Sequence, residues 1–180
     1  SSAREVEIYE TDAGVVLTCN RKNITIKNCD MKNLHQGVKI MYVENLTIEN
    51  NTFTGIKGRD LMLGADLTAL AGEIKITGNT FDGSTDRVIR MTNVDAEVEI
   101  SNNVVKNYAG SNADMVKIDG VQNVEDVTLS GNDWEGVNDE DALDEVVKEK
   151  FDVLQDIEIK DTILPEENLV KAYENRYKNV

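Results

Sequence analysis

Ile24-Thr25-Ile26-Lys27-Asn28-Cys29-Asp30-Met31 is the first clear copy of a phrase that decides the fold of this chain. In each copy two apolar residues flank a polar one, and a polar step, a turn slot and a bulky apolar residue follow. Copies begin at residues 24, 46, 74, 98 and 127, and a degenerate copy begins at 157. A strand-bearing repeat of this period predicts a solenoid.

Apolar and polar residues alternate within each copy, which predicts a strand with one buried face. A second strand-like phrase lies between the copies, at residues 15–17, 38–40, 61–63, 88–91 and 116–118. The strands are too close in sequence for helical crossovers, and the two-residue turns of hairpins are missing. We therefore expect an all-β coil in which each strand pairs in parallel with its counterpart one rung along. Five to six rungs, spaced by about 4.8 Å, would give a rod on the order of 25–30 Å long.

The turn slot of the phrase holds asparagine in four copies, namely Asn51, Asn79, Asn103 and Asn132. Asparagine tolerates the left-handed backbone region, and its amide can bond the same side chain on the next rung. The sequence therefore predicts an asparagine ladder along the stack.

A bulky apolar residue follows the turn slot at a fixed offset of two. These residues are Met31, Phe53, Phe81, Val105 and Trp134, and they predict an internal stack at one corner of the coil. Gly55, Gly83 and Gly136 come two residues later and mark the next bend.

Over roughly residues 15–135, this pattern resembles the right-handed parallel β-helix of the pectate-lyase-like superfamily. The resemblance implies a single-stranded, right-handed coil of parallel strands. It also implies sites on the outer face of the stacked strands. Members include lyases and hydrolases of acidic polysaccharides, phage tailspikes and adhesins, so the likeness is specific for the fold and not for one function.

The C-terminal part of the sequence changes character, and we divide the chain into a β-helix over 1–137 and a cap or domain junction over 138–180. Asn138 is a plausible N-cap, and the acidic residues that follow suit the start of a helix running to Lys150. Pro165 begins a second helical stretch. Such helices would cover the open end of the solenoid.

The chain has 180 residues, and its 34 acidic against 19 basic residues give a formal net charge of −15. This charge argues against nucleic-acid partners and against adsorption to anionic membranes. No stretch approaches the roughly 20 apolar residues that span a bilayer, so no membrane insertion is expected. Ser1 looks like a trimmed or recombinant start, so localisation is not readable from the N-terminus.

The only two cysteines are Cys19 and Cys29. Cys29 occupies the turn slot that asparagine fills in the other copies, which favours buried free thiols. The alternative, if the protein is exported, is a disulfide bond between the two cysteines.

Basic residues gather at the outward positions of the second strand. Lys39, Arg90 and Lys117 are the candidate catalytic residues, with Met62 between the first two. Arg59 and Arg87, in the adjacent turns, are candidate substrate-binding residues. A lyase of uronic acids needs a base, and it needs positive charge to stabilise an enolate. Asp60, Asp114 and Asp119 lie nearby as candidate ligands for Ca²⁺.

The alternative for these charges is a solvated sheet face on which basic and acidic neighbours offset one another. The sequence has no nucleophile elbow, phosphate loop or paired zinc-ligand motif, and its only histidine is His35. We therefore expect a secreted or cell-surface β-helix module that contacts a polysaccharide within a larger polysaccharide-acting or adhesive protein. A calcium-assisted polysaccharide lyase, a purely structural solenoid and self-association through a solenoid end remain alternatives.

Overall fold

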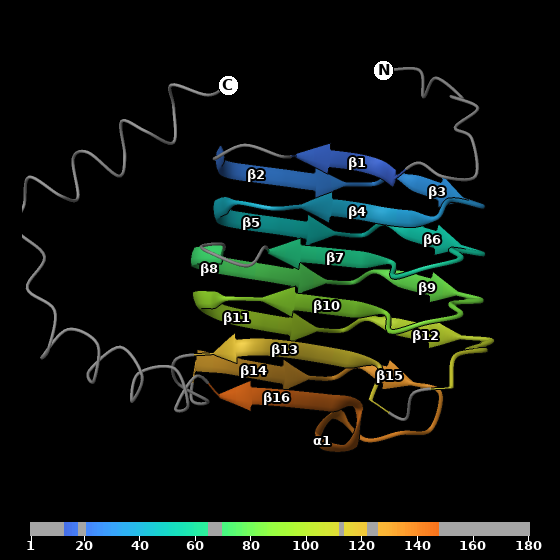
Figure 1. Cartoon of the computed structure of the whole chain (residues 1–180). Helices are drawn as coiled ribbons and strands as arrows, with labels where there is room; N and C mark the ends of the chain where they lie inside the picture. Colours follow the sequence, from blue (N-terminus) through green and yellow to red (C-terminus); the bar gives the residue numbers. More distant parts are fainter. Residues whose placement is uncertain (1–12, 18–20, 65–69, 112–113, 122–125, 148–180) are drawn as a thin grey trace, which may run out of the picture. The chain divides into compact units, whose positions relative to one another are not determined.

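The computed structural model describes residues 13–17, 21–64, 70–111, 114–121 and 126–147. All of them lie in the unit Ser1–Val147, and their strands form three parallel sheets (Figure 1). Sheet A contains β1 (Ala13–Leu17), β4 (Gln36–Ile40), β7 (Leu61–Gly64), β10 (Ile89–Thr92), β13 (Val116–Val121) and β16 (Leu143–Val147). Sheet B contains β2 (Arg21–Lys27), β5 (Val43–Glu49), β8 (Leu70–Thr77), β11 (Val94–Ser101) and β14 (Val127–Ser130). Sheet C contains β3 (Asp30–Lys32), β6 (Thr52–Thr54), β9 (Thr80–Asp82), β12 (Val104–Lys106) and β15 (Asp133–Trp134).

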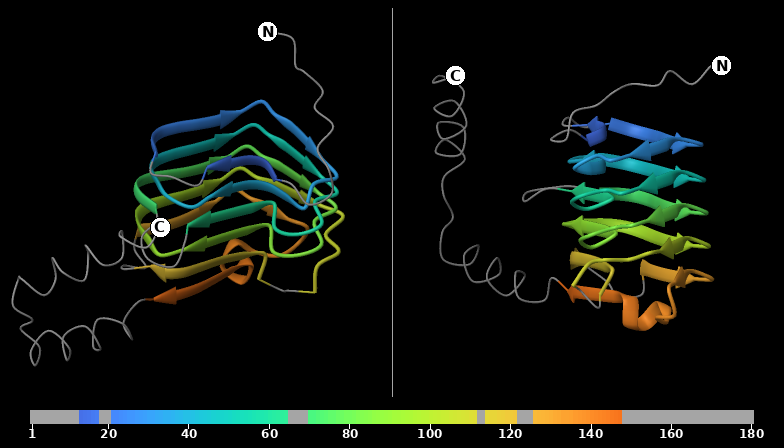
Figure 2. Two further views of the ribbon diagram at one scale, coloured as in Figure 1. Left: turned by 45° about the horizontal axis from the view of Figure 1, so that its top comes forward. Right: turned by 90° about the vertical axis from the view of Figure 1, so that its right-hand side faces the viewer.

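The chain visits the three sheets in turn, so each rung contributes one strand to A, one to B and one to C. Every strand pairs in parallel with the strand of the next rung, and Figure 2 shows the rungs stacked one above another. The result is an all-β parallel solenoid of about five turns, which confirms the predicted fold class. The repeat phrase supplies sheets B and C, and the second phrase supplies sheet A.

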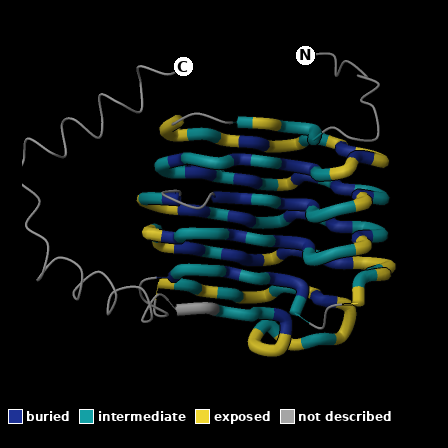
Figure 3. The backbone as a smooth tube through the Cα atoms, in the orientation of Figure 1, coloured by how far each residue is buried: buried dark blue, intermediate teal, exposed yellow. Residues whose placement is uncertain are grey.

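The core lies inside the coil, where the inward side chains of successive rungs are stacked in register. Leu46, Ile74 and Val98 form one such column on sheet B, and all three are essentially inaccessible to solvent. Buried and exposed residues alternate along the strands (Figure 3). Alternation works here because a parallel in-register stack places like beside like, so one apolar position per repeat becomes a continuous apolar column.

The bulky residues of sheet C form a column along one corner of this core. Register places Met31, Phe53, Phe81, Val105 and Trp134 next to one another on successive rungs, and all five are buried. The rings of Phe53 and Phe81 are stacked with their centroids 5.0 Å apart.

The four turn-slot asparagines are hydrogen bonded in series. The Nδ2 of Asn51 donates to the Oδ1 of Asn79 (3.0 Å), Asn79 donates likewise to Asn103 (3.0 Å), and Asn103 donates to Asn132 (2.9 Å). Each Oδ1 also accepts the backbone N–H of the residue in the same slot one rung earlier, Cys29 included. The amides thus satisfy buried backbone groups as well as one another.

Our backbone explanation for the ladder positions was wrong. The left-handed residue is the one before each ladder asparagine, and Asn28, Asn50, Gly78, Asn102 and Gly131 all have φ between 54° and 66°. The asparagine of the ladder is therefore selected by its amide and not by its backbone. The preceding slot takes the residues, asparagine or glycine, that tolerate positive φ.

The ladder ends on a carboxylate of the short helix α1 (Asp139–Ala142). The Oδ1 of Asp139 accepts the Nδ2 of Asn132 (2.9 Å) and the Nε1 of Trp134 (2.6 Å). All ladder amides point their NH₂ groups toward this end, so an anionic acceptor suits the donor end of the series. Asp139 takes the place of an asparagine on a further rung.

The expected helix from Asn138 to Lys150 is wrong over Leu143–Val147, and its last three residues lie outside the described residues. Leu143–Val147 form β16, which pairs with β13 and continues sheet A past residue 137. The open edge of β13 offers a row of backbone hydrogen bonds, and Val146 and Val147 are β-branched residues that favour a strand. The remainder of the expected cap, with the helix beginning at Pro165, lies outside the described residues.

Candidate functional site

The outer face of sheet A carries a row of long side chains, one from each rung. Lys39, Met62, Arg90, Lys117 and Asp144 are direct register partners on β4, β7, β10, β13 and β16; we call them the sheet A row. Their neighbours along each strand, such as Val38 and Ile40, point into the core and are fully buried. The period of two therefore places the three candidate catalytic residues in one line.

Two of the three cations of this row are paired with carboxylates on the next rung. An NH2 nitrogen of Arg90 lies 2.7 Å from Asp119, and the Nζ of Lys117 lies 2.9 Å from Asp144. These side chains are only 21–38% exposed, so the face holds them more firmly than an open surface would. Among the residues that the structure describes, no carboxylate lies within ion-pair distance of Lys39.

The turns that precede sheet A carry a second set of pairs. The Nε of Arg87 donates to Asp114 at 2.9 Å, and the Nε of Arg59 lies 3.6 Å from Asp86. Burial alone would raise the pKa of Asp114, but the hydrogen bond and charge of Arg87 outweigh it and the pKa falls below its ordinary value. The candidate substrate-binding arginines thus flank the sheet A row, and each is paired with an aspartate.

The expected calcium ligands Asp60, Asp114 and Asp119 do not form a cluster in the described part of the chain. Asp60 is buried in the core, Asp114 is bound to Arg87, and Asp119 is bound to Arg90. No group of three His, Cys, Asp or Glu side chains that could hold a metal ion exists within the described part of the chain. Asp114 and Asp119 each pair with an arginine of the neighbouring rung, so arginine side chains balance the charges of these two carboxylates.

The comparisons with known proteins agree with this architecture. A family model described as a right handed beta helix region matches residues 2–133. The chain belongs to the right-handed β-helix family. No curated protein and no solved structure matches the chain. Membership of this β-helix family fixes the fold and leaves the ligand open.

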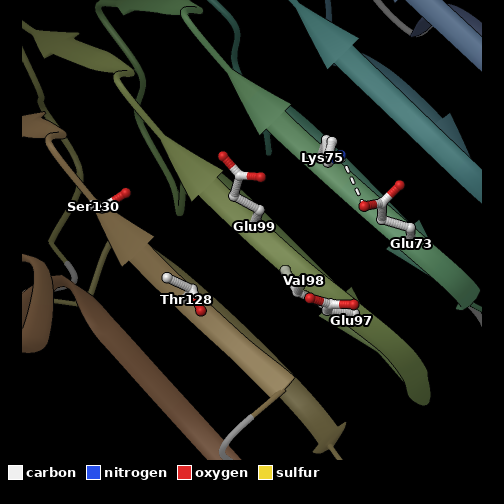
Figure 4. Close-up of a pocket in the computed structure, with 7 residues that line it drawn as sticks. All are labelled: Glu73, Lys75, Glu97, Val98, Glu99, Thr128 and Ser130. Atoms are coloured by element: carbon white, nitrogen blue, oxygen red, sulfur yellow. Dashed lines mark ion pairs between the residues drawn. The ribbon is translucent and has the colours of Figure 1, made fainter.

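A shallow hollow on the opposite part of the β-helix was missed by sequence reasoning. It lies on the outer face of sheet B over β8, β11 and β14, has a volume of about 230 Å³, and is shown in Figure 4. Its lining residues are Glu73, Lys75, Glu97, Val98, Glu99, Thr128 and Ser130. The Nζ of Lys75 pairs with Glu73 at 2.8 Å, and the Glu73 hydrogen bond raises the pKa of Lys75.

This hollow carries three glutamates around one lysine, and its remaining polar groups are hydroxyls. It therefore offers acceptors and little positive charge, unlike the sheet A row, which contains the cations Lys39, Arg90 and Lys117. Outward positions of the repeat were visible in the sequence, but the hollow arises from side-chain length. Short Thr128 on β14 is the register partner of the longer Glu99 on β11, and Ser130 is the partner of Ser101.

Two remaining sequence features do not form part of a site. His35 is exposed in the turn before β4. Cys29 is a half-buried free thiol that donates to the carbonyl of Lys27, and Cys19 lies outside the described residues. Within the described residues, no helix is long and apolar enough to cross a membrane.

Proposed function

We propose that this β-helix is a secreted or cell-surface module that binds a carbohydrate chain along the outer face of sheet A. The observation that carries the proposal is the sheet A row, in which five successive rungs each present one outward side chain in register, and four of the five are polar. A linear polymer laid along the solenoid axis would meet these side chains about 4.8 Å apart. The apolar Met62 in the same row offers contact to the carbon face of a sugar ring.

The paired charges favour a neutral glycan over a polyuronate. Arg87, Arg90 and Lys117 already have carboxylate partners, and the chain carries a net charge of −15 that repels a polyanion. An arginine–aspartate pair offers donors and acceptors side by side, which suits vicinal hydroxyl groups. Sugar hydroxyls are both donors and acceptors, so they match a face of this kind.

A polysaccharide lyase is the second candidate and rests on Lys39. Within the described residues this lysine has no carboxylate within ion-pair distance, and it lies in line with Arg90 and Lys117. A base and a nearby cation are what proton removal beside a uronic carboxylate requires. The calcium that we expected from sequence has no ligand cluster in the described chain, so a lyase here would depend on Lys and Arg alone.

Titration calorimetry with neutral and uronic polysaccharides tests binding. Arg90→Ala removes a member of the row, and Lys27→Ala removes an exposed cation on sheet B and is the matched control. We expect neutral-glycan binding that Arg90→Ala weakens about 10-fold and Lys27→Ala leaves unchanged, as the loss of one charge-assisted hydrogen bond predicts. Equal binding by both variants would contradict the proposed face, and no binding to any polymer would leave a structural solenoid.

A β-elimination assay on polyuronates, followed by ultraviolet absorbance with and without calcium, separates the lyase from the binding module. Unsaturated product that disappears in Lys39→Ala would favour the lyase. Absence of product at high protein concentration, together with measurable glycan binding, would favour the module.

A further inference from the structure

Asp60 is a charged residue type that is buried with the core. It ends the turn between β6 and β7, and its side chain is completely buried. Its carbonyl accepts the N–H of Val38 on the rung before, and the N–H of Leu61 bonds the carbonyl of Val88 on the rung after. Asp60 therefore lies in a column between Gly37 and Val88. A Cβ added at Gly37 would lie only 2.5–2.6 Å from the ring of Phe53 and the carbonyl of Asp60, so the column has no spare room on that side.

Neither carboxyl oxygen of Asp60 has a hydrogen-bond partner within the described residues, and the buried hydroxyl of Ser84 has none either. The charged or titratable side chains of the same turn and of the turns on the two adjacent rungs are His35, Lys57, Arg59, Asp86 and Arg87. Arg59 and Arg87 are engaged with Asp86 and Asp114. An ionised carboxylate in such a place is unstable, because nothing replaces the water it has lost.

We propose that Asp60 is protonated in the folded protein up to neutral pH, and that its ionisation loosens the turn joining sheets C and A. The stability of the β-helix then depends on pH, and it is higher in acidic than in mildly alkaline solution. Burial is the largest cause and raises the pKa of Asp60 to about 7. The side chain of Ser84 lowers it only in part, because the two side chains do not form a hydrogen bond of good geometry. The proposal is independent of what the outer face binds.

The direction of the pH effect follows from proton binding in the two states. Unfolded Asp60 has its ordinary pKa of 3.8, so between this value and about 7 the folded state holds one proton more. The contribution of protonated Asp60 to the free energy of unfolding is therefore complete below pH 3.8 and is lost as the pH rises through about 7. From pH 5 to pH 8.5 the folded-to-unfolded ratio should decrease about 100-fold through this group alone.

Urea unfolding from pH 5 to 8.5, followed by the fluorescence of Trp134, tests the proposal, because this is the chain's only tryptophan and it is fully buried. Asp60→Asn removes the titrating group and keeps the shape. We expect this variant to lose the change of about 100-fold in the folded-to-unfolded ratio that Asp60 causes in the wild type between pH 5 and pH 8.5. Asp114→Asn is the control, because that residue's pKa is lowered and it stays ionised throughout this range. Identical pH slopes for wild type and Asp60→Asn would overturn the proposal.

A second measurement covers the case in which Asp60→Asn fails to fold. The carboxyl carbon resonances of the wild-type aspartates, followed by NMR between pH 5 and 8.5, should include one that titrates near neutrality. Wild-type spectra in which every aspartate is already ionised at pH 5 would overturn the proposal without any variant.

Discussion

The asparagine ladder and the sheet A row both place side chains in register on successive rungs, but their polar groups are satisfied in different ways. In the ladder, identical amides bond one another because an amide is both donor and acceptor, and three of the four are fully buried. In the row, Arg90 and Lys117 pair with the carboxylates of Asp119 and Asp144 on the next rung, and these side chains stay partly exposed. A stack of like groups can be buried when each group complements itself. A stack of charges needs opposite signs and some water.

The comparison predicts that the ladder carries far more stability than the row. Asn79→Ala should have the largest effect, because it removes the acceptor of the buried Asn51 N–H and amide and the amide donor to the carbonyl of Ile48. The loss of these hydrogen bonds costs about 2–5 kcal/mol. Urea unfolding monitored by Trp134 fluorescence measures the loss, with Thr128→Ala on the exposed face of β14 as the control.

A loss below about 1 kcal/mol for Asn79→Ala would mean that water replaces the hydrogen bonds of the amide, and that solvent reaches the ladder.

The end of the ladder should matter less than its middle. Asp139→Ala removes the acceptor of Trp134 Nε1, while Asn132 Nδ2 keeps its bond to the carbonyl of Ile100. We expect a loss of about 1–2 kcal/mol and a change in tryptophan emission. Asp139→Asn keeps an oxygen acceptor and should recover most of the stability. An equal loss in both variants would show that the carboxylate charge is what the end of the ladder requires.

A turn pair should contribute less again and should depend on pH. The pKa of Asp114 is lowered in the folded state, so the stability it gives is present above pH 3.8 and is lost as pH falls below that value. Because the pair is partly solvated, Asp114→Asn should cost about 0.5–1 kcal/mol at pH 6. In urea titrations at pH 3 the variant and wild type should approach one another. A difference that grows in acid would contradict the pairing with Arg87.

The repeat made the ladder, the core column and the in-register row predictable, because a parallel stack converts sequence spacing directly into spatial neighbours. Three features escaped prediction for local reasons. The left-handed residue lies one position before the ladder, where asparagine and glycine are both acceptable. Asp139 was seen as a helix-start residue, although it also ends the ladder. Asp60 was grouped with exposed aspartates, because alternation does not hold in a turn and its burial is visible only in three dimensions.

The smallest expected effect belongs to an exposed pair, and it sets the lower limit of the comparison. The Nζ of Lys27 lies 3.7 Å from Glu49 on the next rung, and the two side chains are 59% and 32% exposed. Like Arg90 and Asp119, this pair joins neighbouring rungs, but its lysine is much more exposed than Arg90. Lys27→Ala should change the free energy of unfolding by about 0–0.5 kcal/mol, whereas Arg90→Ala should exceed it. Equal costs in parallel urea titrations would mean that partial burial adds nothing to a charged row, and that only self-complementary groups stabilise this solenoid.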